Sequence, residues 1–134
     1  MTPAIWWQQL ALVMTGGAFG AGLRFWIGGQ MLRHFGNGLP YGTLAVNFIG
    51  SLAGGFLVVW LEDRGQAALY LRAFLIVGIL GGLTTFSSLM IESLILARAG
   101  RSMAMLTNLG TSLMGGLVLV FVGAWLAGLM RPQG

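Results

Sequence analysis

Cysteine and lysine are both absent from this chain of 134 residues, and only one histidine, His34, is present. Without cysteine there is no disulfide framework, no thiolate nucleophile and no cysteine-ligated metal. Charged residues make up 7% of the chain, whereas a soluble domain has about 25%. This shortage excludes a soluble globular enzyme and a disordered tail. Seven scattered arginines against three acids do not form the dense basic face of a nucleic-acid binder, so no nucleic-acid partner is expected.

The chain is instead rich in apolar residues, which make up 57% of it, and in glycine, with 23 residues. A membrane-spanning helix needs about 20 apolar residues, so the length allows about four spans and little outside the bilayer. Hydropathy and polar breaks predict an all-α polytopic membrane protein, a single four-helix transmembrane domain over residues 1–134, with spans at about 5–32, 41–61, 69–97 and 103–130.

Small residues recur four positions apart in every predicted span. This spacing lets helix backbones approach closely in lipid, and it predicts a compact helical bundle. The pairs are Gly16 and Gly20, Gly50 and Gly54, Gly78 and Gly82, and Ser112 and Gly116.

Arginines are balanced between the two sides of the membrane. One side would carry Arg64, Arg72 and Arg131, and the other Arg33, Arg98 and Arg101. Neither side has an excess of positive charge, so the positive-inside rule predicts almost no preference for one orientation. This balance favours insertion in both orientations and an antiparallel dimer; the alternative is that weaker cues select one orientation.

The third span contains Gly81-Gly82-Leu83-Thr84-Thr85, which is poor helix material. We expect the helix to break there. Freed backbone groups at membrane depth must be buried in protein or line a watery or ionic site. Carbonyl oxygens before the break suit a hard cation, and amides after it suit an anion; a tolerated kink is the alternative.

Polar side chains inside the predicted spans are few. Thr85, Ser88 and Glu92 share one helix face after the break. Glu92 is the only acid in any span, and it indicates either a proton or cation site or an ion pair with an arginine such as Arg98. Asn47 in the second span is either an interhelical hydrogen-bonding group or a donor on a polar path.

Two further spans carry polar groups of interest. Asn108, Thr111 and Ser112 share a face of the fourth span and extend the hydroxyl track, although each is equally compatible with a structural role. Arg24 follows the glycine-rich half of the first span. It is expected to snorkel to the interface, to attract anions at a vestibule, or to cap carbonyls of the broken helix.

Three stretches, residues 17–25 (GAFGAGLRF), 41–50 (YGTLAVNFIG) and 81–87 (GGLTTFS) with Glu92 beyond, resemble the Fluc (CrcB) family of bacterial fluoride channels. The second and third stretches are specific in combination. The resemblance covers about the whole chain, from Gly16 to Gly123.

The resemblance implies an antiparallel, dual-topology dimer in the bacterial inner membrane. Such a dimer is not an enzyme: it lets fluoride flow out of the cell passively through two pores. A structural sodium ion at the dimer centre would be held by backbone carbonyls, here those of Gly81 and Thr84. Together with the hydroxyl tracks, this predicts a vestibule at Arg24 and an anion path lined by Asn47, Thr85, Phe86, Ser87, Ser88, Leu89, Glu92, Thr111 and Ser112.

The chain departs from the family pattern at four positions. Leu89 stands where the pattern has a second phenylalanine, Ser88 replaces a threonine, Met90 replaces a serine, and Asn108 occupies a position often held by tyrosine. A phenylalanine ring has an electropositive edge that can meet an anion, and leucine has none. A variant site, one half of a heterodimer and a channel of altered throughput all remain open.

Two other classes of protein fit the composition. A small dual-topology multidrug exporter also has four short spans and balanced arginines, and would exchange protons at Glu92. A membrane assembly subunit would transport nothing and would co-purify with a partner. The motif resemblance favours the channel over both.

Overall fold

The structure, a computed structural model, describes residues 3–132, with side chains from Ile5 onward. All regular elements in that part of the chain are helical. Four helices are long and apolar enough to cross a membrane, which confirms the expected all-α, four-span architecture. The elements are α1 (Pro3–Phe35), α2 (Tyr41–Trp60), α3 (Ala67–Leu71), η1 (Arg72–Leu80), α4 (Gly81–Leu83), α5 (Phe86–Arg98) and α6 (Ser102–Leu129).

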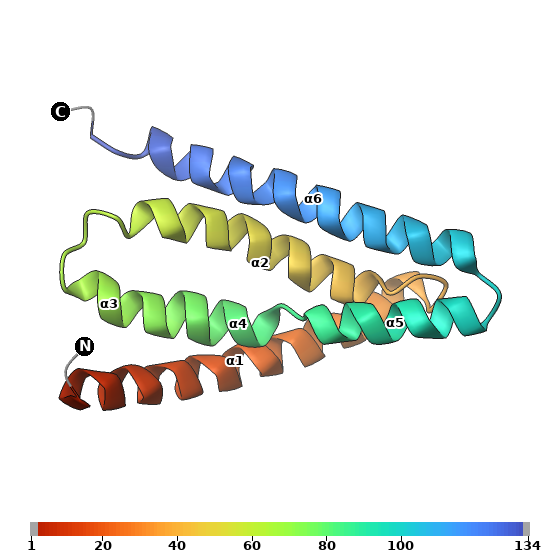
Figure 1. Cartoon of the computed structure of the whole chain (residues 1–134), viewed down its shortest axis with the longest axis horizontal. Coiled ribbons are helices and arrows are strands. Elements are labelled where there is room, and N and C mark those ends of the chain that lie inside the picture. The colour runs from red at the N-terminus through yellow and green to blue at the C-terminus, as the bar shows by residue number, and fades with distance from the viewer. Residues whose placement is uncertain (1–2, 133–134) are drawn as a thin grey trace.

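The spans run up and down in sequence order, so that both ends of the chain lie at the same end of the bundle (Figure 1). The third span consists of α3, η1, α4 and α5, and its first half packs along α1. Helix α2 lies between this span and α6, which packs mainly on α2 (Figure 1). Beyond the break, α5 packs chiefly on α6.

The third span is broken at Thr84 and Thr85, as its composition predicts. Both residues are extended, with φ −82° and ψ 153° at Thr84 and φ −151° and ψ 118° at Thr85. Thr85 is the N-cap of α5, because its side-chain oxygen accepts a hydrogen bond from the Ser88 amide. A new helix therefore starts in mid-span, so the third span is interrupted and not merely kinked. The segment before the break, η1, has the wider turns of a π-helix.

Glycines set the closest helix contacts, as the spacing of small residues predicts. A Cβ atom at Gly20 would collide with the carbonyl oxygen of Ile79, and so α1 reaches η1 only because that side chain is missing. A Cβ atom at Gly123 on α6 would likewise collide with the carbonyl oxygen of Leu52 on α2. These contacts hold α1 against η1 and α6 against α2.

Charged groups collect at the two ends of the bundle. At the end that carries the termini, Arg131 lies 2.7 Å from Glu62 and 2.9 Å from Asp63. At the opposite end, Arg101 donates to the carbonyl of Gly38 (2.6 Å). Each contact ties together two chain segments that meet at that end.

Candidate functional site

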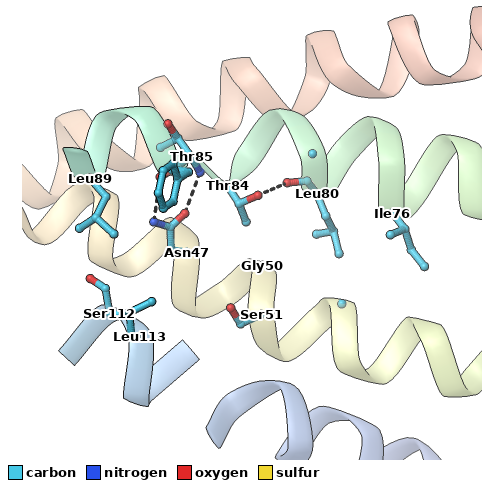
Figure 2. A pocket seen from close by; sticks show the side chains of 13 residues that line it. Asn47, Gly50, Ser51, Ile76, Leu80, Thr84, Thr85, Leu89, Ser112 and Leu113 are labelled. Carbon is cyan, nitrogen blue, oxygen red and sulfur yellow. Dashed lines mark hydrogen bonds between the residues drawn. The ribbon is translucent and has the colours of Figure 1, made fainter. Parts of the chain in front are cut away.

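Asn47 on α2 binds the backbone at the break. Its Oδ1 accepts from the amide of Thr85 (2.8 Å), and its Nδ2 donates to the Thr85 carbonyl (3.1 Å), as Figure 2 shows. The interhelical hydrogen-bonding role expected for Asn47 is therefore confirmed. An amide nitrogen carries two hydrogens, so one donor remains after the bond to Thr85.

Arg24 on α1 also forms a hydrogen bond with the backbone of the broken helix. Its Nε donates to the carbonyl of Gly82 (3.0 Å), just before the break. Of the three roles considered for this arginine, the capping of carbonyls is present. A role in attracting anions stays a prediction.

A groove lies between α2, the third span and α6, with a volume of about 450 Å³. We call it the central groove. It brings together most of the expected path and sodium-site residues, with Asn47, Thr85 and Leu89 around one end (Figure 2). The lining consists of Asn47, Gly50, Ser51, Gly54, Ile76, Leu80, Gly81, Thr84, Thr85, Phe86, Leu89, Ser112 and Leu113.

Two further grooves adjoin one another beside α1. The arginine groove, of about 560 Å³, is lined by Arg24, Thr43, Thr85 and Ser88 among others. The glutamate groove, of about 310 Å³, contains Thr43 and Glu92 and reaches the loop between α1 and α2. Thr43 borders both grooves, and so it stands at their junction.

The hydroxyl groups after the break form a short hydrogen-bonded chain. Thr85 Oγ1 donates to Ser88 Oγ (3.1 Å) and accepts from the Ser88 amide (3.1 Å). The Ser87 hydroxyl lies 3.3 Å from the same Thr85 oxygen. Because the Thr85 hydrogen is committed to Ser88, the hydroxyl hydrogen of Ser88 is left for the arginine groove.

Glu92 is partly buried and accepts a hydrogen bond from Thr43 Oγ1. Its Oε2 is buried without a partner in the described part of the chain. No arginine of residues 3–132 lies within ion-pair distance of Glu92, so the ion pair considered with Arg98 is absent. Thr43 was not among the expected site residues, although its position one helical turn before Asn47 places both on one face of α2.

The other expected path residues differ in exposure. Leu89 and Ser112 are buried on the central groove, and Phe86 lines it with 71% of its surface exposed. Ser87 is exposed beside the break. Thr111 is exposed and lines none of the three grooves. Within one chain it therefore lies apart from the other expected path residues.

The four apolar spans and the polar groups gathered around a broken helix define a multi-pass membrane protein with a polar site inside the bilayer. Such a site is typical of proteins that pass ions or polar solutes. The class follows from the fold and the site together.

Comparison with known proteins identifies the family. Residues 11–124 match the family described as CrcB-like protein, Camphor Resistance (CrcB). Over 124 residues the chain is 56% identical to a Fluoride-specific ion channel FluC of Xanthomonas axonopodis pv. citri (strain 306), covering 92% of this chain and 93% of that one. A channel of the same name from Xylella fastidiosa (strain 9a5c) is also 56% identical, over 92% of this chain and 87% of its own.

A more distant channel of the same name, from Hydrogenovibrio crunogenus (strain DSM 25203 / XCL-2), is 38% identical over 87% of this chain and 89% of its own. The chain therefore belongs to the CrcB family, and the resemblance seen in its motifs is confirmed.

Proposed function

We propose that the chain forms a fluoride-selective channel through which fluoride leaves the bacterial cell passively across the inner membrane, so that fluoride toxicity falls. Two antiparallel copies form the channel, with two pores per dimer. One observation carries the proposal: hydrogen-bond donors gather around the broken third span of a chain whose relatives are named fluoride-specific ion channels.

Fluoride is small and strongly hydrated, so a narrow path has to replace its water with other donors. The central groove offers the remaining amide hydrogen of Asn47, the hydroxyl of Ser112 and the electropositive ring edge of Phe86. Several moderate sites in a row allow an ion both to enter and to leave. The groove thus supports conduction better than tight storage of an anion.

The arginine groove is the proposed vestibule. Arg24 donates a hydrogen bond from Nε to the Gly82 carbonyl. The rest of its guanidinium group brings positive charge to the groove, which Ser88 also lines. A cleft lined by one sign of charge raises the local concentration of the opposite ion. Fluoride would therefore be enriched where the hydroxyl of Ser88 is ready to donate.

The antiparallel dimer is supported by the charge at the two ends of the bundle and by the open side of the central groove. Each end carries three arginines, so neither orientation is strongly preferred. The groove between α2, the third span and α6 is open along one side, where a second copy would complete it. The arginines are Arg64, Arg72 and Arg131 at one end and Arg33, Arg98 and Arg101 at the other.

The proposed sodium site fits the residues that line the central groove. Gly81 and Thr84 lie there at the break, and the lining contains no carboxylate, so backbone carbonyl oxygens and neutral amide and hydroxyl oxygens are the ligands on offer. Hard cations prefer oxygen ligands. The two carbonyl oxygens of Gly81 and Thr84 in one chain are fewer than a hard cation takes, and a second copy would double the set. Bound sodium would offset the carbonyl dipoles and add positive potential near the anion path.

The test is fluoride efflux from liposomes that contain the purified chain alone, followed with a fluoride electrode in sodium-containing buffer. We expect efflux well above that of empty liposomes and a much slower efflux of chloride. Efflux no faster than from empty liposomes contradicts the proposal, and equal rates for the two anions contradict its selectivity.

The proton-coupled multidrug exporter is the second candidate, favoured only by the buried, unpartnered Oε2 of Glu92. It predicts proton-driven uptake of a cationic dye that Glu92→Gln abolishes. The same liposomes measure both activities, so that dye uptake without fluoride efflux selects the exporter.

A further inference from the structure

A polar pocket of about 370 Å³ lies where α2 and α6 end, at the end of the bundle that carries the termini (Figure 1). Both helices are long and apolar enough to span a membrane, and tryptophan, one of the lining residues, is enriched where a membrane meets water. These features place the pocket at the depth of lipid headgroups. Its lining residues are Trp60, Asp63, Arg64, Met130, Arg131 and Pro132.

The charged groups of this pocket keep hydrogen-bonding capacity after their contacts with one another. Asp63 lies 2.9 Å from Arg131, yet 81% of its side chain is accessible, and a carboxylate has about four acceptor positions. Arg64 lies over the Trp60 ring, 3.9 Å from the ring centroid. This stacking positions the guanidinium group without using its five N–H donors. The pocket thus offers an acceptor for a cation beside donors for an anion.

An apolar groove of about 420 Å³ lies between α2 and α6, and its lining is apolar throughout. It follows α2 from Ile49 to Leu57, roughly 12 Å at 1.5 Å per residue. Half of the hydrocarbon core of a bilayer is about 15 Å thick. The groove therefore has the length of a lipid acyl chain within one leaflet. In residues 3–132 it shares no lining residue with the central groove, so a second copy placed over the central groove need not cover it.

The apolar groove leads toward the polar pocket along both helices. Ile49 and Phe56 of the groove share one face of α2 with Trp60 of the pocket, because they are seven and four positions apart. Leu126 of the groove likewise lies four positions before Met130 of the pocket on α6. An apolar channel that ends in a pocket with both signs of charge matches the two parts of a phospholipid.

We propose that this end of the chain binds one phosphatidylethanolamine, with its phosphate on Arg64, its ammonium group on Asp63 and one acyl chain in the groove between α2 and α6. Charge complementarity selects the headgroup. An anionic headgroup without an amine would bring a like charge to Asp63, and a quaternary ammonium group has no hydrogen to donate to a carboxylate. The inference concerns lipid binding and does not depend on the proposed channel function.

The experiment titrates the full chain in detergent with dioleoyl phosphatidylethanolamine, phosphatidylcholine or phosphatidylglycerol and counts bound lipid by native mass spectrometry. The three lipids have the same acyl chains, so only the headgroup differs. We expect phosphatidylethanolamine to bind several-fold more tightly than either of the others. Equal binding of the three lipids overturns the inference, because the lipids then only surround the protein. Preferred binding of phosphatidylglycerol or phosphatidylcholine overturns it too.

Two variants test the headgroup contacts. Arg64→Gln and Asp63→Asn should each weaken the binding of phosphatidylethanolamine about two- to fivefold, as expected for an exposed charge pair. Asp63→Asn should also bind phosphatidylglycerol more tightly, because a like charge is removed. In that variant Glu62 still pairs with Arg131. Arg98→Gln, at the opposite end of the bundle, is the control and should bind like the unmodified chain. Unchanged binding in both pocket variants overturns the inference.

A third variant tests the place of the acyl chain. Ala53→Phe fills the groove and should weaken the binding of phosphatidylethanolamine more than Val58→Phe, a control at a 42% exposed position of the same helix. Equal binding of these two variants overturns the place given to the acyl chain. Asp63 and Arg64 are exposed, so their variants test the proposal even if Ala53→Phe does not fold.

Discussion

Two asparagines in neighbouring helices show how differently one residue type is used in this chain. Asn47 on α2 gives both ends of its amide group to the backbone of Thr85. Asn108 on α6 is buried, and its Nδ2 has no partner in the described residues. The difference arises from what each side chain faces.

Asn47 faces a break, where the backbone amide and carbonyl of Thr85 are not paired within a helix. Asn108 lies on α6, which packs on α2 and α5, and the backbone groups inside a helix are paired with one another. Polar side chains beside the break therefore stabilise the fold. A buried polar side chain that finds no partner costs stability. Three predictions test this contrast.

The largest effect is expected for Asn47→Leu, which leaves two backbone groups of Thr85 without partners. We expect a loss of about 1–3 kcal/mol for each group, seen as a lower unfolding temperature in detergent. The matched variant Asn108→Leu should change stability by less than about 1 kcal/mol, because removing an unpartnered amide is nearly neutral. Equal losses for the two variants would remove the contrast.

A smaller effect is expected at Arg24. Arg24→Met loses the hydrogen bond to the Gly82 carbonyl, and we expect a loss of about 1–2 kcal/mol in stability, measured in the same way. Arg24→Lys keeps the charge but not the planar group. If the vestibule prediction holds, Arg24→Lys passes fluoride faster than Arg24→Met in the liposome assay. Equal efflux of the two would confine Arg24 to its capping role.

The smallest effect is expected at the end of the bundle that carries the termini. The pair of Arg131 and Glu62 is exposed, with 37% and 47% of the side chains accessible. Glu62→Gln should cost no more than about 1 kcal/mol, and the cost should shrink further in high salt. Asp63, which lies 2.9 Å from Arg131, still pairs with it in this variant. A larger loss than that of Arg24→Met would reverse the ranking of the two regions.

Much of the fold follows from the order of residues along the chain. The four spans follow from hydropathy, because a bilayer admits few polar residues. The break follows from two glycines and two threonines in mid-span. The shared face of Thr85 and Ser88 follows from helical periodicity, and the structure joins these two hydroxyls by a hydrogen bond. Each of these features is local in sequence.

Contacts between spans were harder to foresee. The bonds from Asn47 to Thr85 join residues 38 positions apart, and the bond from Thr43 to Glu92 spans 49. Thr111 shares a predicted track with Ser112 yet is exposed, while Ser112 is buried. Periodicity places residues on a face, but it does not say which neighbour that face meets.

The sequence by itself therefore determined the membrane class, the four spans, the break and the family, because composition, periodicity and motifs are properties of the chain alone. Only the tertiary structure decided that Asn47 and Arg24 form hydrogen bonds with backbone groups at the break, while Asn108 Nδ2 and Ser112 Oγ have no partner in the described residues. The physical reason is that a hydrogen bond depends on which groups the packing of distant helices brings within reach. Where packing supplies no partner among the described residues, the donor stays unpaired, as at Asn108 Nδ2 and Ser112 Oγ.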